Sequence, residues 1–238
     1  MSEQQEANLG RVSISIHPSS VQTIEGYEEQ EQFLAPVVTV FKTAYDGLQR
    51  VHDAAEAAKQ NPAWNEEARI LHVNEAGERV MAGIAKQIDS VRATLGSQIK
   101  FLDAELSKPL AMDAERPAIA AEIRAHAKSL PMSERFTFLN LAHESGDNVT
   151  LRAVLGAPGY LSGINEEERQ QRTRRHHEKT QPVTFKRLRA AQDALRLIDD
   201  RTPLVWRELV KAVGAPPMKV HAIKTANQRA TAAIKAAV

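Results

Sequence analysis

The most regular apolar pattern in this chain of 238 residues lies between about residues 65 and 107. Its positions are separated by three or four residues, which is the spacing of one face of an α-helix. They are Val73, Gly77, Val80, Ile84, Ile88, Val91, Leu95, Ile99, Leu102 and Leu106. The intervals repeat every eleven residues, a period that keeps an apolar stripe on one face of an almost straight helix. We therefore predict a helix of about 43 residues, about 64 Å long at ~1.5 Å per residue.

A shorter apolar stripe precedes this helix, from about Glu28 to Asn61-Pro62, where proline disfavours a helical conformation in the residue before it. The simplest arrangement of the two helices is an antiparallel hairpin. Because the first helix is shorter, part of the long helix must pack against another partner, either the C-terminal half of the chain or a second copy. We expect the packing positions to be Val73, Val80, Ile84, Ile88, Val91, Leu95, Ile99, Leu102 and Leu106.

The N-terminal region has a different pattern. Arg11-Val-Ser-Ile-Ser-Ile16 alternates polar and apolar residues, which is typical of a short half-buried strand, and His17-Pro-Ser-Ser20 would end it. One strand cannot form a sheet by itself. It could add to the edge of a sheet elsewhere or run extended over the helices, so residues 1–27 are predicted to form an extended arm.

After Pro109 the sequence predicts shorter helices joined by turns. Asn165-Glu-Glu-Glu168 has the capping residue and the first-turn acids of a helix start, and Thr202-Pro203 is expected to begin a further helix. The predicted fold is all-α. It has the arm at 1–27, a long antiparallel helical hairpin at 28–110, and a helical bundle with a basic C-terminal segment at 111–238.

The composition, with 42% hydrophobic and 5% aromatic residues, is ordinary for a folded helical protein. The absence of cysteine excludes disulfides and cysteine-ligated metals and is usual in a reducing compartment. The N-terminus lacks the pattern of a secretory signal, and no run approaches the ~18 apolar residues that span a bilayer. We expect a cytoplasmic protein that is not inserted in a membrane.

The net charge of +1 conceals an uneven distribution. Residues 1–60 hold four basic and nine acidic side chains, whereas residues 201–238 hold seven basic and one acidic side chain. Such asymmetry suits a basic tail that binds nucleic acid, or one end of a subunit that meets the other end of its neighbour.

Residue patterns for catalysis, metals or cofactors are weak. His143-Glu144 lacks the second histidine that a zinc-protease helix needs four residues after the first, and His176-His177 point to different helical faces. The glycine-rich loop at 156–163 lacks the lysine of a phosphate-binding loop, and its Tyr160 and Leu161 are expected to fold back onto the helices. We predict no catalytic residue, no metal site and no cofactor.

Basic side chains gather in two places. In the first, between residues 169 and 189, we select Arg172, Arg174 and Arg175 as candidate contacts to a phosphate backbone or an acidic protein surface. The alternative is a solvated helix face that the acids at 166–168 partly neutralise.

The second place, at 203–229, has the apolar spacing and turn glycine of a helix-turn-helix unit. Its second helix carries the candidate contacts Lys219, Lys224 and Arg229. Val210 stands where such units prefer a small residue, and Pro216-Pro217 makes the turn unusual. The competing interpretation is an ordinary helical hairpin with a positive face.

Residues 114–182 carry a further pattern of helix caps and turns. Its segments are Ala121-Glu-Ile-Arg124, Leu130-Pro-Met-Ser-Glu-Arg135, Ser145-Gly-Asp147, Ala153-Val-Leu-Gly-Ala-Pro158, Leu161-Ser-Gly163 and Glu166-Glu-Glu-Arg169. This pattern resembles helical proteins of unassigned function that bacteriophages and prophages encode. The resemblance implies a phage protein and a virion component, and it assigns no functional residue.

Together these features predict a non-enzymatic structural or interaction subunit of an oligomeric assembly, incorporated in a bacteriophage virion. Its partners would be further copies or other proteins of the assembly, with nucleic acid at the basic segments as an open alternative. The second hypothesis is a DNA-binding regulator that reads DNA with residues 203–229 and dimerises through the hairpin.

Overall fold

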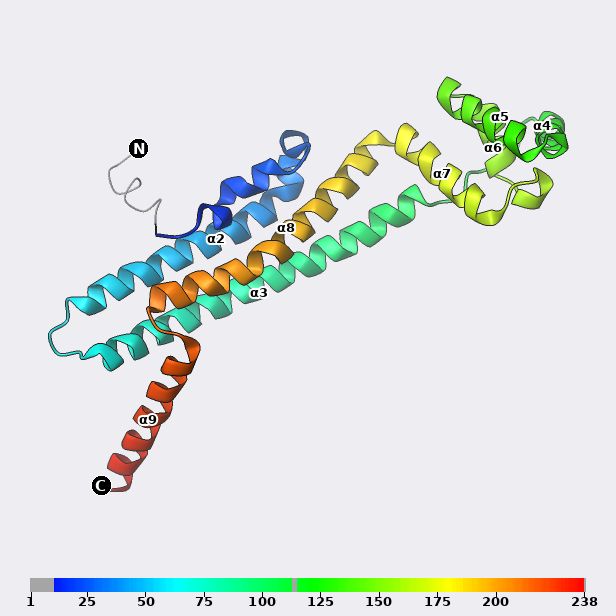
Figure 1. Cartoon of the computed structure of the whole chain (residues 1–238). Coiled ribbons are helices and arrows are strands. Elements are labelled where there is room, and N and C mark those ends of the chain that lie inside the picture. Colours follow the sequence, from blue (N-terminus) through cyan, green and yellow to red (C-terminus); the bar gives the residue numbers. More distant parts are fainter. Residues whose placement is uncertain (1–10, 113–114, 238) are drawn as a thin grey trace. The chain divides into compact units, whose positions relative to one another are not determined.

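The structure is a computed structural model that describes residues 11–112 and 115–237. Every regular element in these ranges is helical, as the sequence predicts (Figure 1). The 3-10 helices are η1 (Ile14–Ile16), η2 (Pro18–Thr23) and η3 (Gly159–Leu161). The α-helices are α2 (Tyr27–Lys59), α3 (Glu66–Leu106), α4 (Pro117–Ser129), α5 (Met132–Ser145), α6 (Asn148–Leu155), α7 (Glu166–Thr180), α8 (Pro182–Val213) and α9 (Pro217–Ala236).

The chain divides into two compact units. The first unit comprises the chain up to Gln98 together with the segment from Arg189 onward, and the second comprises Ile99–Leu188. These bounds differ from the expected divisions near residues 27 and 110, because the C-terminal part of α8 returns to α2 and α3 in the first unit. The first ten residues of the expected arm lie outside the described residues.

In the first unit α2 and α3 lie side by side and antiparallel (Figure 1). Two helical glycines mark their close approach: a Cβ atom on Gly47 would lie 2.8 Å from Val80 Cγ1, and one on Gly77 would lie 3.6 Å from Val51 Cγ1. The same atom on Gly77 would come within 2.5 Å of Leu209 Cδ1. Residues from α2 and α8 therefore both pack against this part of α3.

The eleven-residue stripe of α3 lies on the buried side of the helix. Val73, Ile84, Leu95 and Leu106 are buried, and no other stripe position is exposed. In the second unit Leu102 and Leu106 pack with Leu188 from the start of α8, and Ile99 and Phe185 join them. α2 is too short to cover the whole α3 stripe, and α8 of the same chain covers the remaining part.

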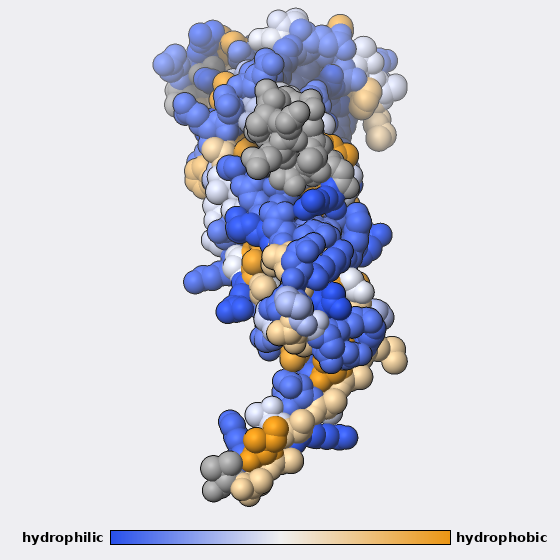
Figure 2. All heavy atoms as spheres, turned by 90° about the vertical axis from the view of Figure 1, so that its left-hand side faces the viewer, coloured by the Kyte–Doolittle hydropathy of each residue, from blue (hydrophilic) through white to orange (hydrophobic). Residues whose placement is uncertain are grey.

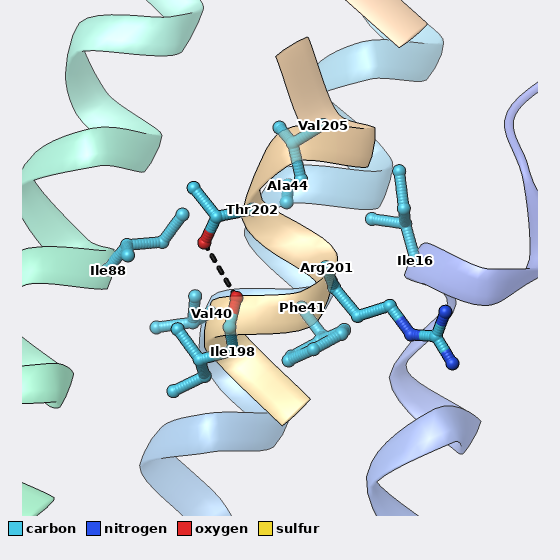
Figure 3. A pocket seen from close by; sticks show the side chains of 9 residues that line it. All are labelled: Ile16, Val40, Phe41, Ala44, Ile88, Ile198, Arg201, Thr202 and Val205. Atoms are coloured by element: carbon cyan, nitrogen blue, oxygen red, sulfur yellow. Dashed lines mark hydrogen bonds between the residues drawn. The ribbon is translucent and has the colours of Figure 1, made fainter. Parts of the chain in front are cut away.

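Figure 3 shows the core of the first unit from close by, where η1, α2, α3 and α8 converge. Ile88 from α3 faces Ile198 from α8, and Phe41 and Ile16 close the space from α2 and η1. The space between these side chains is only about 10 Å3, which is close to the least that one water molecule requires. It is a packed core rather than a ligand site.

The strand expected at residues 11–16 is not seen. The backbone forms 3-10 turns instead: the amide of Ile16 donates to the carbonyl of Ser13 at 3.0 Å, and the amide of Ser15 donates to the Ser13 hydroxyl at 3.3 Å. No other strand exists in the described ranges to accept backbone hydrogen bonds, so local turns satisfy these groups. The alternation places Val12 and Ile16 in the core and leaves Ile14 exposed.

Two further expectations differ from the structure. α8 continues through Thr202-Pro203, where a new helix was expected, and the Thr202 hydroxyl donates to the carbonyl of Ile198 at 2.7 Å. Tyr160 and Leu161 in η3 are exposed, while Ala157, Gly159, Ser162 and Ile164 around them are buried. The expected cap of α7 is present, because the Asn165 side chain accepts the amide of Glu168 at 2.7 Å.

The second unit is built around a core of small and branched residues from α4, α5, α6 and the segment after η3. Its members are Ala127, Leu139, Ala142, Leu151, Val154, Leu155 and Ile164. Arg135 connects three segments around this core, because its guanidinium donates to the carbonyls of Ala127 at 2.7 Å, Leu130 at 2.8 Å, and Gly163. These backbone contacts hold α5 against α4 and the loop before α7.

The burial of the α3 stripe predicts the effect of shortening one side chain. Ile84 is 1% exposed and Ile14 is 59% exposed, both in the first unit. We expect Ile84→Ala to lower the free energy of unfolding by about 2–5 kcal/mol, because it leaves a cavity between packed helices. The matched exchange Ile14→Ala should cost less than about 1 kcal/mol. Urea unfolding followed by circular dichroism measures both, and equal losses would contradict this packing.

Candidate functional site

The first two turns of the C-terminal helix α9 pack against α3 and the end of α8. Gly214 makes the turn after α8 with a φ of 74°, a conformation that favours glycine, and Pro217 occupies the first helical position of α9. Val220 is buried in a hollow that Leu209 and Val213 also line. This contact fixes where α9 begins.

Two ion pairs join the same part of α9 to α3. Lys219 Nζ lies 2.6 Å from Glu66 Oε1, and Lys224 Nζ lies 2.6 Å from Glu78 Oε1. The hydrogen bonds from these lysines hold the pKa of the Glu66 and Glu78 carboxyls below their usual range. The basic C-terminal segment therefore meets acidic residues of its own chain.

These pairs bear on the helix-turn-helix interpretation. Two of the candidate DNA contacts, Lys219 and Lys224, point at carboxylates of α3. Carboxylates at that surface repel phosphate, and a recognition helix needs its basic side chains directed outward to the groove. Lys219 and Lys224 are thus paired with acids of α3 in this structure.

The candidate arginines of α7 lie in the second unit, and the structure does not bring them into one site. Arg172 is buried, donates to Glu168 Oε1 at 2.8 Å, and lies over the ring of Phe136 at 4.9 Å from its centre. Arg174 Nη1 lies 2.6 Å from Asp103 Oδ1, and its Nε lies 3.0 Å from Glu178 Oε1. Both guanidinium groups are used for packing within the unit.

The two remaining candidates are directed to solvent. Arg175 on α7 and Arg229 on α9 are exposed, and neither makes an ion pair with another residue that the structure describes. They lie in different units. Of the six basic residues selected from the sequence, these two make no ion pair with a residue that the structure describes.

Three histidines approach one another inside the second unit. The ring centres of His143 and His176 are 6.5 Å apart, and those of His176 and His177 are 5.8 Å apart. His177 Nε2 lies 2.8 Å from the Lys108 carbonyl oxygen and its Nδ1 lies 2.9 Å from Gln181 Nε2, so the neutral Nε2–H form satisfies both contacts. Within the described ranges no group of histidine, aspartate and glutamate is arranged to hold a metal ion.

His143 is the most deeply buried of the three, and its Nε2 has no hydrogen-bond partner. Burial, followed by the positive charges of Arg175 and Arg172, lowers the pKa of His143 to about 4. Burial also lowers the pKa of His176. His143 and His176 are therefore neutral packing residues near neutral pH.

The C-terminal half of α9 differs from every other part of the first unit. Each residue from Ala226 to Ala236 is exposed, and Ile234 is 68% exposed. Figure 2 shows hydrophobic spheres along this helix at the bottom of the view. Sequence analysis missed this surface, although Val220, Ile223, Asn227, Ala230 and Ile234 are spaced alternately by three and four residues.

An open groove runs between this part of α9 and the start of α3. The α3 wall is formed by Asn65, Glu67, Ala68, Leu71 and His72, and the α9 wall by Ala222, Ile223, Ala226, Asn227 and Ala230. Trp64 stacks on His72 at the edge of the α3 wall, with ring centres 4.3 Å apart. The groove is thus lined by small and apolar side chains with a few polar groups.

The second unit has an exposed apolar surface of its own. α5 buries Leu139 and Ala142 on one side and exposes Met132, Phe136 and Leu141 on others. None of the helices described is long and apolar enough to cross a membrane. Exposed apolar patches on a folded protein commonly mark contacts with other proteins.

Comparison with known proteins gives no match to a family model, a curated protein or a solved structure. The functional argument therefore rests on the contacts and exposed surfaces of this chain.

The buried state of His143 predicts a pH dependence of stability. Its pKa is about 4 in the folded chain against 6.5 without the fold, so the unfolded chain takes up a proton first as the pH falls. Stability is complete above about pH 6.5 and declines between about pH 6.5 and 4, with about 2 kcal/mol lost by about pH 5. Urea unfolding at several pH values should show this decline, and His143→Gln should reduce its slope.

The control is His126→Gln, which changes an exposed histidine of the same unit. If His143→Gln and His126→Gln gave the same pH profile as the original chain, the neutral buried state of His143 would be refuted.

Proposed function

We propose that this protein is a non-enzymatic structural subunit that works by associating with further copies or other proteins of an assembly. The observation that carries the proposal is the C-terminal half of α9, where every residue from 226 to 236 is exposed, including the apolar stripe of Ala230 and Ile234. Helical segments of about 12 residues are marginal in water by themselves. A partner that covers this stripe would supply the missing packing.

The charge of α9 favours a protein partner over specific DNA reading. Lys219 and Lys224 are engaged with Glu66 and Glu78, which leaves Arg229 and Lys235 as basic side chains of α9 without an ion pair to any described residue. Two isolated positive charges on α9 make a small contact area for a phosphate backbone. An apolar stripe flanked by a few charges is typical of helix pairing.

The surfaces that are exposed for association differ from the one expected from the sequence. The length of the predicted hairpin left part of the α3 stripe without a partner, but α2 and α8 cover that stripe within the molecule. The exposed surfaces are the C-terminal half of α9 and the outer side of α5. We therefore assign association to these two helices.

The setting that we propose is a bacteriophage particle, with synthesis in the cytoplasm. It is supported by the resemblance of residues 114–182 to helical phage proteins. The second unit contains this whole segment, and its capped helices and glycine turns are the features that the resemblance rests on.

The proposal predicts the mass of the protein in solution. Light scattering after size-exclusion chromatography should give a mass above the 26.3 kDa of one chain, increasing with protein concentration. Random duplex DNA, added over a range of salt concentrations, should not bind at physiological salt. A single-chain mass at every concentration would contradict the proposal, and tight, sequence-selective DNA binding by a dimer would instead support the regulator hypothesis.

A further inference from the structure

We propose that the acidic start of α2 in one copy binds to a basic hollow between α5 and α7 in a second copy. This inference rests on the proposed function and names the partner of the α5 surface. It follows from the charges that line the hollow and from the acidic stretch in which α2 begins.

The hollow lies within the second unit and has an open space of about 330 Å3. Met132 and Phe136 from α5 line it with apolar side chains that are 83% and 57% exposed. Its charged lining residues are three arginines and one acid, which leaves a net charge of +2. They are Arg135, Arg172, Arg175 and Glu168.

Arg172 is the buried arginine of this hollow, and its guanidinium is held in place. Its Nε donates to Glu168 Oε1 at 2.8 Å, and its Nη1 donates to Asn140 Oδ1 at 3.0 Å. Its Nη2 makes no hydrogen bond with a residue that the structure describes. A positioned guanidinium with a free N–H group is suited to bind a carboxylate.

The other two arginines add positive charge that no carboxylate of the described ranges pairs with. Arg175 is exposed, and Arg135 donates to backbone carbonyls rather than to an acid. The neighbouring His143 experiences the same positive field. Its pKa is lowered first by burial and then by the positive groups Arg175, Arg172, His176 and Lys179.

The start of α2 carries the acids that this hollow lacks. Residues 12–41 contain four glutamates and no aspartate, lysine or arginine. Of these glutamates, Glu25, Glu28 and Glu31 are exposed and make no ion pair within the part of the chain that the structure describes. Hydrogen bonds between guanidinium groups and carboxylates are about twice as strong as those between neutral groups. A second copy of the chain therefore supplies a complementary surface.

The shape of the basic surface favours a protein over a nucleic acid as the partner. A phosphate backbone is bound by a stripe of basic side chains, whereas the arginines here converge on one hollow. Arg174, the next arginine of α7, is directed to Asp103. The exposed Met132 and Phe136 beside the charges suit contact with another folded surface.

The two surfaces differ from each other, so the contact is heterologous. A pair of copies keeps one free hollow and one free α2 start, and further copies add to them until a ring closes or a filament extends. The mass should therefore increase with protein concentration. It should decrease with added salt, because salt screens exposed charges.

The first test reverses one charge at two exposed positions of the second unit. Arg175 lines the hollow and Arg152 on α6 does not, and neither makes an ion pair with a described residue. Arg175→Glu places a carboxylate opposite the glutamates of α2, so we expect the dissociation constant to rise roughly tenfold or more. Arg152→Glu should leave it within about threefold. Analytical ultracentrifugation measures both, and circular dichroism checks that both variants fold.

The second test mixes two variants that are each weakened. Glu31→Arg reverses a charge at the start of α2 and should weaken self-association as Arg175→Glu does. An equal mixture of the two variants should bind again, because each keeps the surface that the other has lost. A mixture that binds no more tightly than either variant alone would contradict a contact between these surfaces.

The third test uses the absence of cysteine from the chain. Chains with Gln32→Cys and chains with Gln171→Cys, each carrying a different tag, are mixed and oxidised, and neither substitution removes a charge. A disulfide between the two differently tagged chains is expected, because Gln171 lines the hollow and Gln32 is exposed near the start of α2. The matched control replaces the second variant by Gln170→Cys, an exposed neighbour that does not line the hollow.

The outcomes separate this inference from the proposed function. If the protein associates but Arg175→Glu and Arg152→Glu behave alike, and the mixed disulfide forms no faster than the control, the hollow is not the interface and the proposed function stands. If Arg175→Glu removes binding of random duplex DNA and leaves self-association unchanged, the hollow binds phosphate and the inference is wrong. If the unaltered protein is a single chain at all concentrations, this inference and self-association in the proposed function fail together.

Discussion

The structure depends on the burial of one apolar stripe along α3. Val73, Ile84 and Leu95 lie in the first unit and Leu106 in the second, all buried, and each unit forms its core partly from this helix. At about 25 cal/mol for each Å2 of apolar surface removed from water, such a stripe outweighs the polar contacts at the surface. The positions of α2 and α8 beside α3, and so the place where α9 starts, follow from this burial.

The sequence predicted the parts of the fold that repeat. The eleven-residue period located α3, observed as 41 residues against about 43 expected, and the Asn165 cap located the start of α7. It did not predict features that depend on distant contacts. Residues 11–16 have the alternation of a strand but no strand to pair with, and Thr202-Pro203 has a helix-start signal that the packing of α8 overrides. Local sequence patterns also do not show which helices pack against the α3 stripe.

The basic residues are the clearest case in which contacts between distant parts of the chain could not be predicted from the sequence. The sequence identified six candidate contacts to nucleic acid or another polyanion, but ion pairs depend on what lies opposite in space. Arg172 and Arg174 meet acids from α7 and α3, and Lys219 and Lys224 meet glutamates of α3 that lie about 150 positions earlier in the chain. The positive charge of the C-terminal segment is thus partly compensated by glutamates of α3 in the same chain. The apolar spacing of Ile223, Ala230 and Ile234 on α9 can be recognised in the sequence, but their exposure depends on where the helix packs.

We propose that the C-terminal half of α9 becomes covered when copies of this protein associate. Hydrogen exchange of the full-length protein, read by mass spectrometry at low and high protein concentration, tests it directly. The amides of residues 228–236 should exchange fast in the dilute protein and become protected in the concentrated protein, while the amides around Ile84 stay protected in both. Fast exchange of residues 228–236 at every concentration, or equal protection at every concentration, would contradict the account.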